Sequence, residues 1–406
     1  MVKREALKIL ITTIMCLLII LTAAACFGNS GKNDPDPTPP PTTEPLPTPP
    51  PPTEPPEPEP VVLVPYDGVV EHLFFHEVIA YPEVAFPNQT DANRLDDYMI
   101  TVHEFNMILK GLHKNNFVLI DMNDVWSEFI NDSGNKRMRR NTLMIPEGKK
   151  PIVLSFDDLS FYNYMTGDGF MSRYIVGHDG EIWAEGVDPR GNPVVSQDLA
   201  AITVLDKFVK ENPDFSHNGA KGCLALTGYE GILGYRTQTD KSDNSQEFRL
   251  NRMQEVARVK PVVERLHETG WYFASHSWGH IRFSSASLNL VKEDAARWKD
   301  EVGSLVGDTV IMIYAHGERL DGNDVWRETA GPALRFYVDD MGFRMFASVG
   351  YEPFSKIRTD VPAVMMDRMN SDGITLRRTR DRFMRFYDAK EVFDPLRPTN
   401  IEKLWD

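Results

Sequence analysis

Cysteine is scarce in this chain of 406 residues, which contains only three. Cys16 and Cys26 lie in the first 26 residues, so Cys223 is the only cysteine in the rest of the chain. One cysteine cannot form a disulfide framework or a cysteine-based metal site. Small domains stabilised by disulfides or by cysteine-bound metals are therefore excluded.

Positive charge is also in short supply. The chain has 44 Lys and Arg against 59 Asp and Glu, which gives a formal net charge of −15. Such a balance argues against a general binder of nucleic acid or other polyanions. It is compatible with neutral or cationic glycans.

The N-terminus holds the longest apolar run. A basic start at residues 1–8 precedes apolar residues 9–25, and small residues then lead to Cys26. This pattern predicts a secretion signal at 1–26. The cysteine after the alanines resembles a bacterial lipoprotein cleavage site, although Ala23 stands where leucine is usual. The alternative is an uncleaved membrane anchor. Both interpretations tether the rest to the outer, extracytoplasmic face of the bacterial cell membrane.

Residues 27–60 are dominated by proline, with threonine and glutamate between. Such a segment buries little apolar area and favours extended polyproline II. We expect a disordered linker. It serves either as a semi-rigid tether within a cell wall or as an inert spacer.

From residue 61 to 406, short apolar runs alternate with amphipathic stretches. Repeated strand–helix alternation predicts a parallel sheet with helices outside it. The length suits one catalytic domain, an α/β barrel with insertions. We expect strands at 73–78, 117–120, 151–156, 223–227, 271–275, 310–314, 346–349 and 363–366, and helices at 101–115, 198–210, 248–268, 287–303, 326–341 and 381–393.

Two intervening segments are interpreted differently. The basic residues 136–140 are expected to form a loop. Residues 161–197 are an insertion, in which 174–183 alternates around an Asp-Gly turn and predicts a hairpin. The insertion forms either a wall of the site or a surface decoration.

Acids and histidines follow two of the expected strands. Asp157 and Asp158 end the strand at 151–156, and His276 and His280 follow the strand at 271–275. Histidines four residues apart project to one side of a helical turn. One carboxylate then completes three ligands of a divalent metal and leaves a position for water. The other aspartate is free to act as a base, because adjacent side chains diverge. The alternative is that the acids cap a helix and the histidines are ordinary core or surface residues.

Three motifs resemble the NodB-homology polysaccharide deacetylases. They are Ser-Phe-Asp-Asp at 155–158, His-Ser-Trp-Gly-His at 276–280 and Tyr-Ala-His-Gly at 314–317. The resemblance covers residues 69–378 and includes Leu-Phe-Phe-His at 73–76, which looks like the first strand of the extracellular members. It implies a distorted (β/α) barrel of that type, with insertions. It also implies a hydrolase that removes N-acetyl groups from an amino-sugar polysaccharide of the cell envelope.

The resemblance implies roles for the acids and histidines. Asp158, His276 and His280 would hold the metal, and Asp157 would be the general base. Zinc is the expected metal, and cobalt or nickel also accept such ligands.

The third motif departs from the family pattern. Members commonly have proline followed by tyrosine and glycine, whereas Ala315 and His316 stand here before Gly317. The backbone N–H of His316 would inherit the oxyanion role, and Tyr314 and Gly317 would contact substrate. Many members also carry a late histidine as the general acid, but no histidine follows His316. His316 itself or His76 is the candidate acid. Alternatively, the protonated Asp157 returns its proton, or the activity is impaired.

For the other candidates a structural role is the favoured alternative. Arg368 either orients a site acid or forms an ordinary salt bridge. Trp278, Tyr229 and Trp183 either stack on sugar rings or belong to the core.

The expected partners are an N-acetylated polysaccharide, such as peptidoglycan or poly-N-acetylglucosamine, and the membrane through the N-terminal lipid or anchor. No nucleic-acid partner is expected, and the protein is expected to be a monomer. Two other functions stay open: a non-catalytic glycan-binding lipoprotein with a decayed site, and an O-acetyl esterase of the same fold. A His-Glu-x-x-His peptidase is disfavoured because His76-Glu77 lacks the second histidine.

Overall fold

The computed structural model describes residues 61–87, 92–240, 242–243, 245–322 and 324–398. These described residues form one compact unit. The predicted signal at 1–26 and linker at 27–60 lie outside the described residues.

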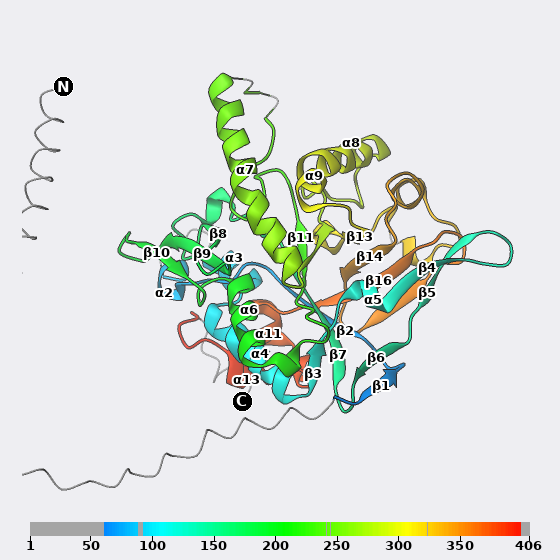
Figure 1. Ribbon diagram of the computed structural model, residues 1–406, viewed down its shortest axis with the longest axis horizontal. Coiled ribbons are helices and arrows are strands. Elements are labelled where there is room, and N and C mark those ends of the chain that lie inside the picture. Colours follow the sequence, from blue (N-terminus) through cyan, green and yellow to red (C-terminus); the bar gives the residue numbers. More distant parts are fainter. Residues whose placement is uncertain (1–60, 88–91, 241, 244, 323, 399–406) are drawn as a thin grey trace, which may run out of the picture. The chain divides into compact units, whose positions relative to one another are not determined.

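A closed parallel barrel stands at the centre of this unit (Figure 1). The ring closes because β11 pairs with β7 as well as with β12. This confirms the predicted distorted (β/α) barrel. Within the described residues, the ring contains β2 (Glu71–Phe75), β7 (Lys150–Asp157), β11 (Cys223–Leu226), β12 (Tyr272–Ser275), β13 (Ile311–Ile313), β14 (Met345–Val349) and β16 (Val364–Asn370).

Two extra strands distort the ring. β3 (Phe117–Leu119) pairs with the first half of β7, and β11 pairs with its second half. In the same way, β15 (Phe354–Ile357) runs antiparallel to the first half of β16, whereas β2 pairs with the second half. The barrel wall therefore changes partners halfway along β7 and β16.

Side chains of β7 alternate between the two sides of the wall. Leu154 and Phe156 belong to the apolar cluster that contacts the outer helices, whereas Val153 belongs to the cluster inside the barrel. Because strand side chains alternate, Ser155 and Asp157 share the inner face with Val153. The strand thus carries polar groups into the carboxyl end of the barrel.

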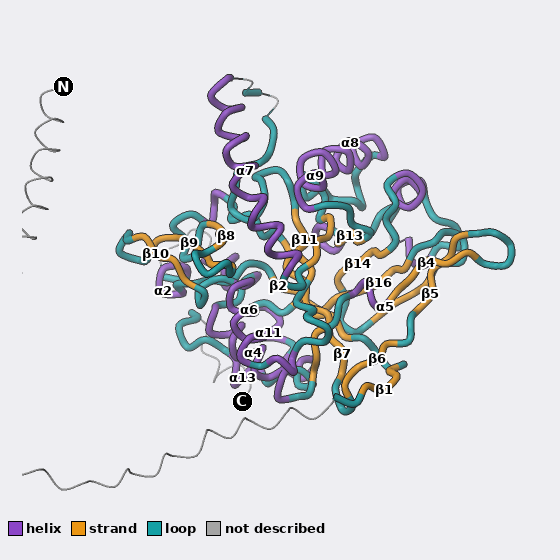
Figure 2. The backbone as a smooth tube through the Cα atoms, viewed as in Figure 1, coloured by secondary structure: helices purple, strands orange, loops and turns teal. Residues whose placement is uncertain are grey.

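Helices surround the strands (Figure 2). α4 (Val102–Lys114) starts at a capping box formed by Thr101 and Glu104. In α7 (Gln246–Glu268) the buried residues all lie between Val259 and Leu266, and its first half projects from the barrel (Figure 1). The remaining helices are α2 (Pro82–Ala85), α3 (Ala92–Tyr98), α5 (Met122–Val125), α6 (Ala201–Glu211), α8 (Leu288–Trp298), α9 (Ser304–Val306), α10 (Pro332–Arg335), α11 (Gly373–Arg378), α12 (Arg380–Phe383) and α13 (Ala389–Val392).

Smaller antiparallel sheets complete the unit. The expected hairpin is confirmed as β8 (Arg173–Val176) and β9 (Ile182–Val187), which β10 (Pro193–Ser196) extends. β1 (Leu63–Tyr66) pairs with β6 (Leu143–Pro146), and β4 (Trp126–Ile130) pairs with β5 (Lys136–Arg140).

Three of the expected elements are wrong in type or extent. Residues 136–140 form strand β5 and not a loop, because the charged side chains flank the single buried Met138. The helix expected at 326–341 starts only at Pro332, after Gly331. The helix expected at 381–393 is split into α12 and α13. None of the helices in the described residues is long and apolar enough to cross a membrane.

Candidate active site

The carboxyl ends of β7 and β12, which flank β11 in the ring, bring the predicted ligands together. Asp158 follows β7, and His276 and His280 follow β12. One ligand atom from each of the three lies within 4.8 Å of the others. The two sequence motifs, more than a hundred residues apart, thus meet at one end of the barrel, where sites of this fold form.

The backbone at these positions is unusual. Asp158 has a φ of 61°, Ser277 of 64° and His280 of 51°, and His316 nearby has a φ of 57°. Non-glycine residues seldom adopt this left-handed region. Such outliers cluster at functional sites, where the surrounding structure enforces them.

Two of the three candidate ligands, His276 and Asp158, are oriented by a second contact. The Nδ1 atom of His276 lies 2.9 Å from the carbonyl oxygen of Ile313, which leaves Nε2 for the site. The Tyr162 hydroxyl donates to Asp158 Oδ1 at 2.6 Å, and Asp158 Oδ2 faces His280 Nε2 at 3.6 Å. Supporting contacts of this kind are typical of metal ligands.

The protonation states also suit a divalent metal. Burial lowers the pKa of His280 to about 4, against the charge of Asp158, so the imidazole is neutral at pH 7. Burial opposes ionisation of Asp158, but the charges of His276 and His280 outweigh it and lower the carboxyl pKa. Two imidazoles and a carboxylate form the kind of donor set that zinc takes at catalytic sites.

Asp157 is buried beside the ligands and forms an ion pair with Arg368. The Nη1 and Nη2 atoms of Arg368 donate to Oδ1 and Oδ2 of Asp157 at 2.8 and 2.9 Å. Burial opposes ionisation of the carboxyl, but the charge of Arg368 outweighs it and lowers the pKa to about 2. Asp157 is therefore an ionised carboxylate at neutral pH, and Arg368 is its ion-pair partner.

The third motif approaches the site through His316. Its ring centroid lies 4.2 Å from that of His280, and its Nε2 lies 3.2 Å from the His280 carbonyl oxygen. Gly317 has a φ of 66°, and a Cβ atom there would come within 2.7 Å of Val349, so a glycine is required. The Tyr314 ring instead lies buried against Phe346, in the apolar cluster outside the barrel.

His76, at the end of β2, also faces the site. Its charge would lower the pKa of both Asp157 and Asp158, which places it near the two acids. The Nδ1 atom of His76 is buried and has no hydrogen-bond partner within the described residues. This histidine therefore has a spare donor or acceptor directed away from solvent.

The three aromatic candidates differ in position. Arg297 covers the Trp278 ring at 3.2 Å from its centroid. The Trp183 Nε1 atom donates to Asp179 within the β8–β9 hairpin. Tyr229 instead stacks on Tyr162, with ring centroids 5.0 Å apart, and Tyr162 in turn contacts the candidate ligand Asp158.

Tyr162 and Thr227 belong to the site but were not expected from the sequence. The Tyr162 hydroxyl contacts both Asp158 and Thr227, which ties the start of the insertion to the site. The spacing of four residues after Asp158 was the only available signal. The hairpin lies farther along the insertion and packs against α6 and α7.

Comparisons with known proteins give only remote similarities. No family model matches the chain, and a search of curated proteins found no match. Among solved structures, the Streptococcus pyogenes deacetylase PplD in complex with acetate is 12% identical, with a TM-score of 0.40, and the match covers 76% of this chain and 94% of that one. IcaB from Ammonifex degensii is 10% identical, with a TM-score of 0.35, covering 80% and 97%. The deacetylase domain of BpsB from Bordetella bronchiseptica is 11% identical, with a TM-score of 0.33, covering 78% and 100%. An activity cannot be transferred at these values, so the function has to be inferred from the site itself.

Proposed function

We propose that this protein is a metal-dependent hydrolase of the NodB-homology deacetylase type, which removes N-acetyl groups from an amino-sugar polysaccharide. The observation that carries the proposal is the joint position of Asp158, His276 and His280 beside the ionised Asp157. A ligand triad next to a separate base is what metal-assisted hydrolysis requires.

The roles follow from the contacts. Asp158, His276 and His280 would hold the metal, with zinc expected and cobalt or nickel acceptable. A bound divalent metal supplies a water of lowered pKa and polarises the acyl oxygen. Asp157 accepts the proton of the attacking water, and the backbone N–H of His316 stabilises the oxyanion. The C–N bond then breaks, and acetate and an amine are released.

The general acid has to protonate the leaving nitrogen. His316 is exposed, and its Nε2 atom already contacts the His280 carbonyl. His76 is more buried and near both acids, with an unpaired ring nitrogen among the described residues. These differences favour His76, with His316 as the alternative.

Substrate and location extend the proposal. We infer a polymer such as peptidoglycan or poly-N-acetylglucosamine, with Tyr229 as the best-placed aromatic for stacking on a sugar ring. A lipidated Cys26 or an uncleaved anchor, followed by the proline-rich segment, would hold a monomeric enzyme on the outer face of the membrane.

Acetate release from chitooligosaccharides tests the function. We expect release by the wild type, which a chelator abolishes and which Asp157→Asn reduces by roughly 10²–10⁴-fold. Asp198→Asn, an exposed aspartate paired with Lys207, is the matched control and should stay active. Glycan binding without acetate release would support the non-catalytic alternative. Release only from O-acetylated glycans would support the esterase.

A further inference from the structure

A chain of buried polar residues continues from Asp157 into the barrel. Arg368 is 1% exposed, Ser155 0% and His72 7%. They lie on the inner faces of β16, β7 and β2, which are neighbours in the ring. Polar side chains buried this deep in a barrel destabilise the fold unless they are hydrogen-bonded.

Hydrogen bonds connect the members of this chain. Arg368 Nη1 donates to both Asp157 Oδ1 and Ser155 Oγ, the latter at 3.1 Å. Ser155 Oγ lies 2.8 Å from His72 Nε2. A hydroxyl has two lone pairs and one proton, so Ser155 can accept from Arg368 and donate its proton to His72 Nε2. In this arrangement His72 is the acceptor and carries its own proton on Nδ1.

Two further observations agree with this arrangement. Burial and the charge of Arg368 hold the pKa of His72 well below its usual range, so the imidazole is neutral and can accept. The Arg368 guanidinium also lies over the Phe74 ring, 4.0 Å from its centroid. Phe74 thus packs on one face of the Arg368 guanidinium, and Ser155 accepts a hydrogen bond from its edge.

We propose that Ser155 and His72 are positioning residues, which fix the Arg368 guanidinium against Asp157 and so keep the base aimed at the attacking water. This inference rests on the proposed hydrolase function. Loss of the serine hydroxyl leaves Arg368 Nη1 with one partner fewer and His72 Nε2 with none. A buried group without a partner destabilises the geometry around it.

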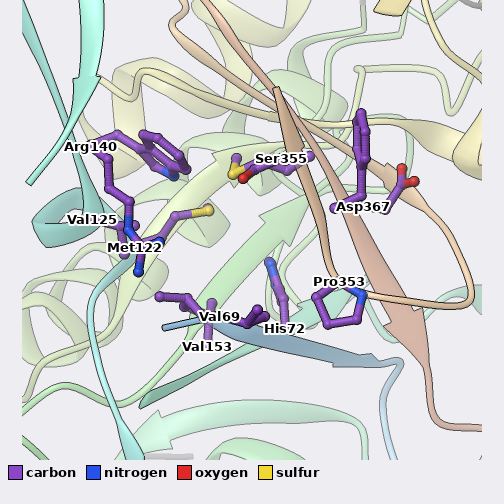
Figure 3. Close-up of a pocket in the computed structure, with 13 residues that line it drawn as sticks. Val69, His72, Met122, Val125, Arg140, Val153, Pro353, Ser355 and Asp367 are labelled. Atoms are coloured by element: carbon purple, nitrogen blue, oxygen red, sulfur yellow. The ribbon is translucent and has the colours of Figure 1, made fainter. Parts of the chain in front are cut away.

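A cavity beside His72 gives small molecules access to this chain of polar residues. The cavity measures about 130 Å³ and is lined by Val69, Val153, Pro353 and His72, among others. Figure 3 shows the His72 ring between Val69 and Pro353, directed into this space. It lies where β15 replaces β2 as the partner of β16. A cavity of ~150 Å³ accepts benzene, so a His72→Ala variant has room for added imidazole.

The first test compares Ser155→Ala with Ser155→Thr in the full chain, by acetate release at fixed metal content. We expect kcat of Ser155→Ala to fall by roughly ten- to hundred-fold, as for other groups that orient site residues. KM should change little, because substrate contacts are untouched. Ser155→Thr keeps the hydroxyl and should recover most of kcat. Thr203→Val, a buried hydroxyl outside the barrel, is the matched control and should keep the wild-type kcat.

The second test uses His72→Ala with and without imidazole in the assay. We expect a loss of kcat similar to that of Ser155→Ala, and a several-fold gain when imidazole is added. Imidazole should not accelerate the wild type or Ser155→Ala, which lacks the connecting hydroxyl. This test stands even where Ser155→Ala fails to fold.

The outcomes separate the two proposals. A wild type that releases no acetate from any acetylated glycan contradicts the proposed function. An active wild type together with full kcat in Ser155→Ala and His72→Ala overturns the positioning roles alone. So does a Ser155→Thr variant as slow as Ser155→Ala, or a His72→Ala variant that imidazole leaves unchanged.

Discussion

The two ends of the barrel interior differ in chemistry, although the same strands build both. At the amino end of β7, Val153 packs with Ile145 and Met366 in an apolar cluster. At the carboxyl end, Asp157 meets Arg368 and the candidate metal ligands. A parallel barrel stabilises its lower half by packing and leaves its upper half for function.

The backbone follows this division in part. Asp158, Ser277, His280 and His316 are left-handed and follow the carboxyl ends of barrel strands, although Asn116 and Asn218, which precede β3 and β11, are left-handed too. A substitution at the upper end should therefore change activity first, whereas one at the lower end should change stability first. His72 is the exception, because it lies level with Val153 but is hydrogen-bonded to Ser155.

The largest effect is expected at the general acid. His76→Gln should lower kcat by roughly 10²–10⁴-fold, since a positioned acid contributes about that much. His316→Gln should have the smaller effect, because the oxyanion contact comes from its backbone. Rate measurements on both variants, with metal content as the control, decide the assignment. The reverse ranking would move the acid to His316.

At the lower end, Ile145→Ala should act on stability alone. Ile145 is 1% exposed, and truncating such a residue costs about 2–5 kcal/mol. Denaturant unfolding should show this loss, while kcat per folded molecule stays at the wild-type value. A fall in kcat of the folded protein would contradict the division between the two ends.

Glu77, a buried acid after β2, should make the unfolding free energy depend on pH. Its carboxylate accepts from the backbone N–H of Ala201 and from the Tyr174 hydroxyl, and burial raises its pKa to about 7. Because the folded pKa exceeds the unfolded value near 4.5, its contribution is full below pH 4.5 and is lost as pH rises through 7. The shift corresponds to about 3 kcal/mol. Glu77→Gln should flatten the wild-type decline in unfolding free energy between pH 4.5 and 7, and an unchanged slope would exclude Glu77 as its source.

The smallest effect is expected at Tyr162. Tyr162→Phe removes the donor to Asp158 Oδ1 but keeps the ring stacked on Tyr229. Metal affinity should weaken by about ten-fold, as for other groups that orient ligands. Competition with a chelating dye measures this affinity. Equal affinity in both proteins would remove Tyr162 from the site.

Local sequence patterns predicted the barrel and the convergence of Asp158 with His276 and His280. Strand ends of a parallel sheet meet at one edge, so residues at those ends can be paired without a structure. The same patterns left Arg368 between two interpretations, because its partner Asp157 lies 211 positions away.

Other features depend on packing that no local pattern encodes. β5 was mistaken for a loop because its five residues carry four charges around Met138. The contact of Tyr162 with Asp158 depends on how the insertion leaves the barrel. The chain from Ser155 to His72 crosses between two strands and becomes visible only in their register.

Metal titration of the chelated protein tests the central claim most directly. Acetate release from chitooligosaccharides should be absent in the metal-free protein. It should rise with added zinc and level off at one ion per chain, whereas His276→Ala should stay inactive over the same range. Full activity in the metal-free protein, or a wild-type titration in His276→Ala, would contradict the assignment of Asp158, His276 and His280 as the metal site.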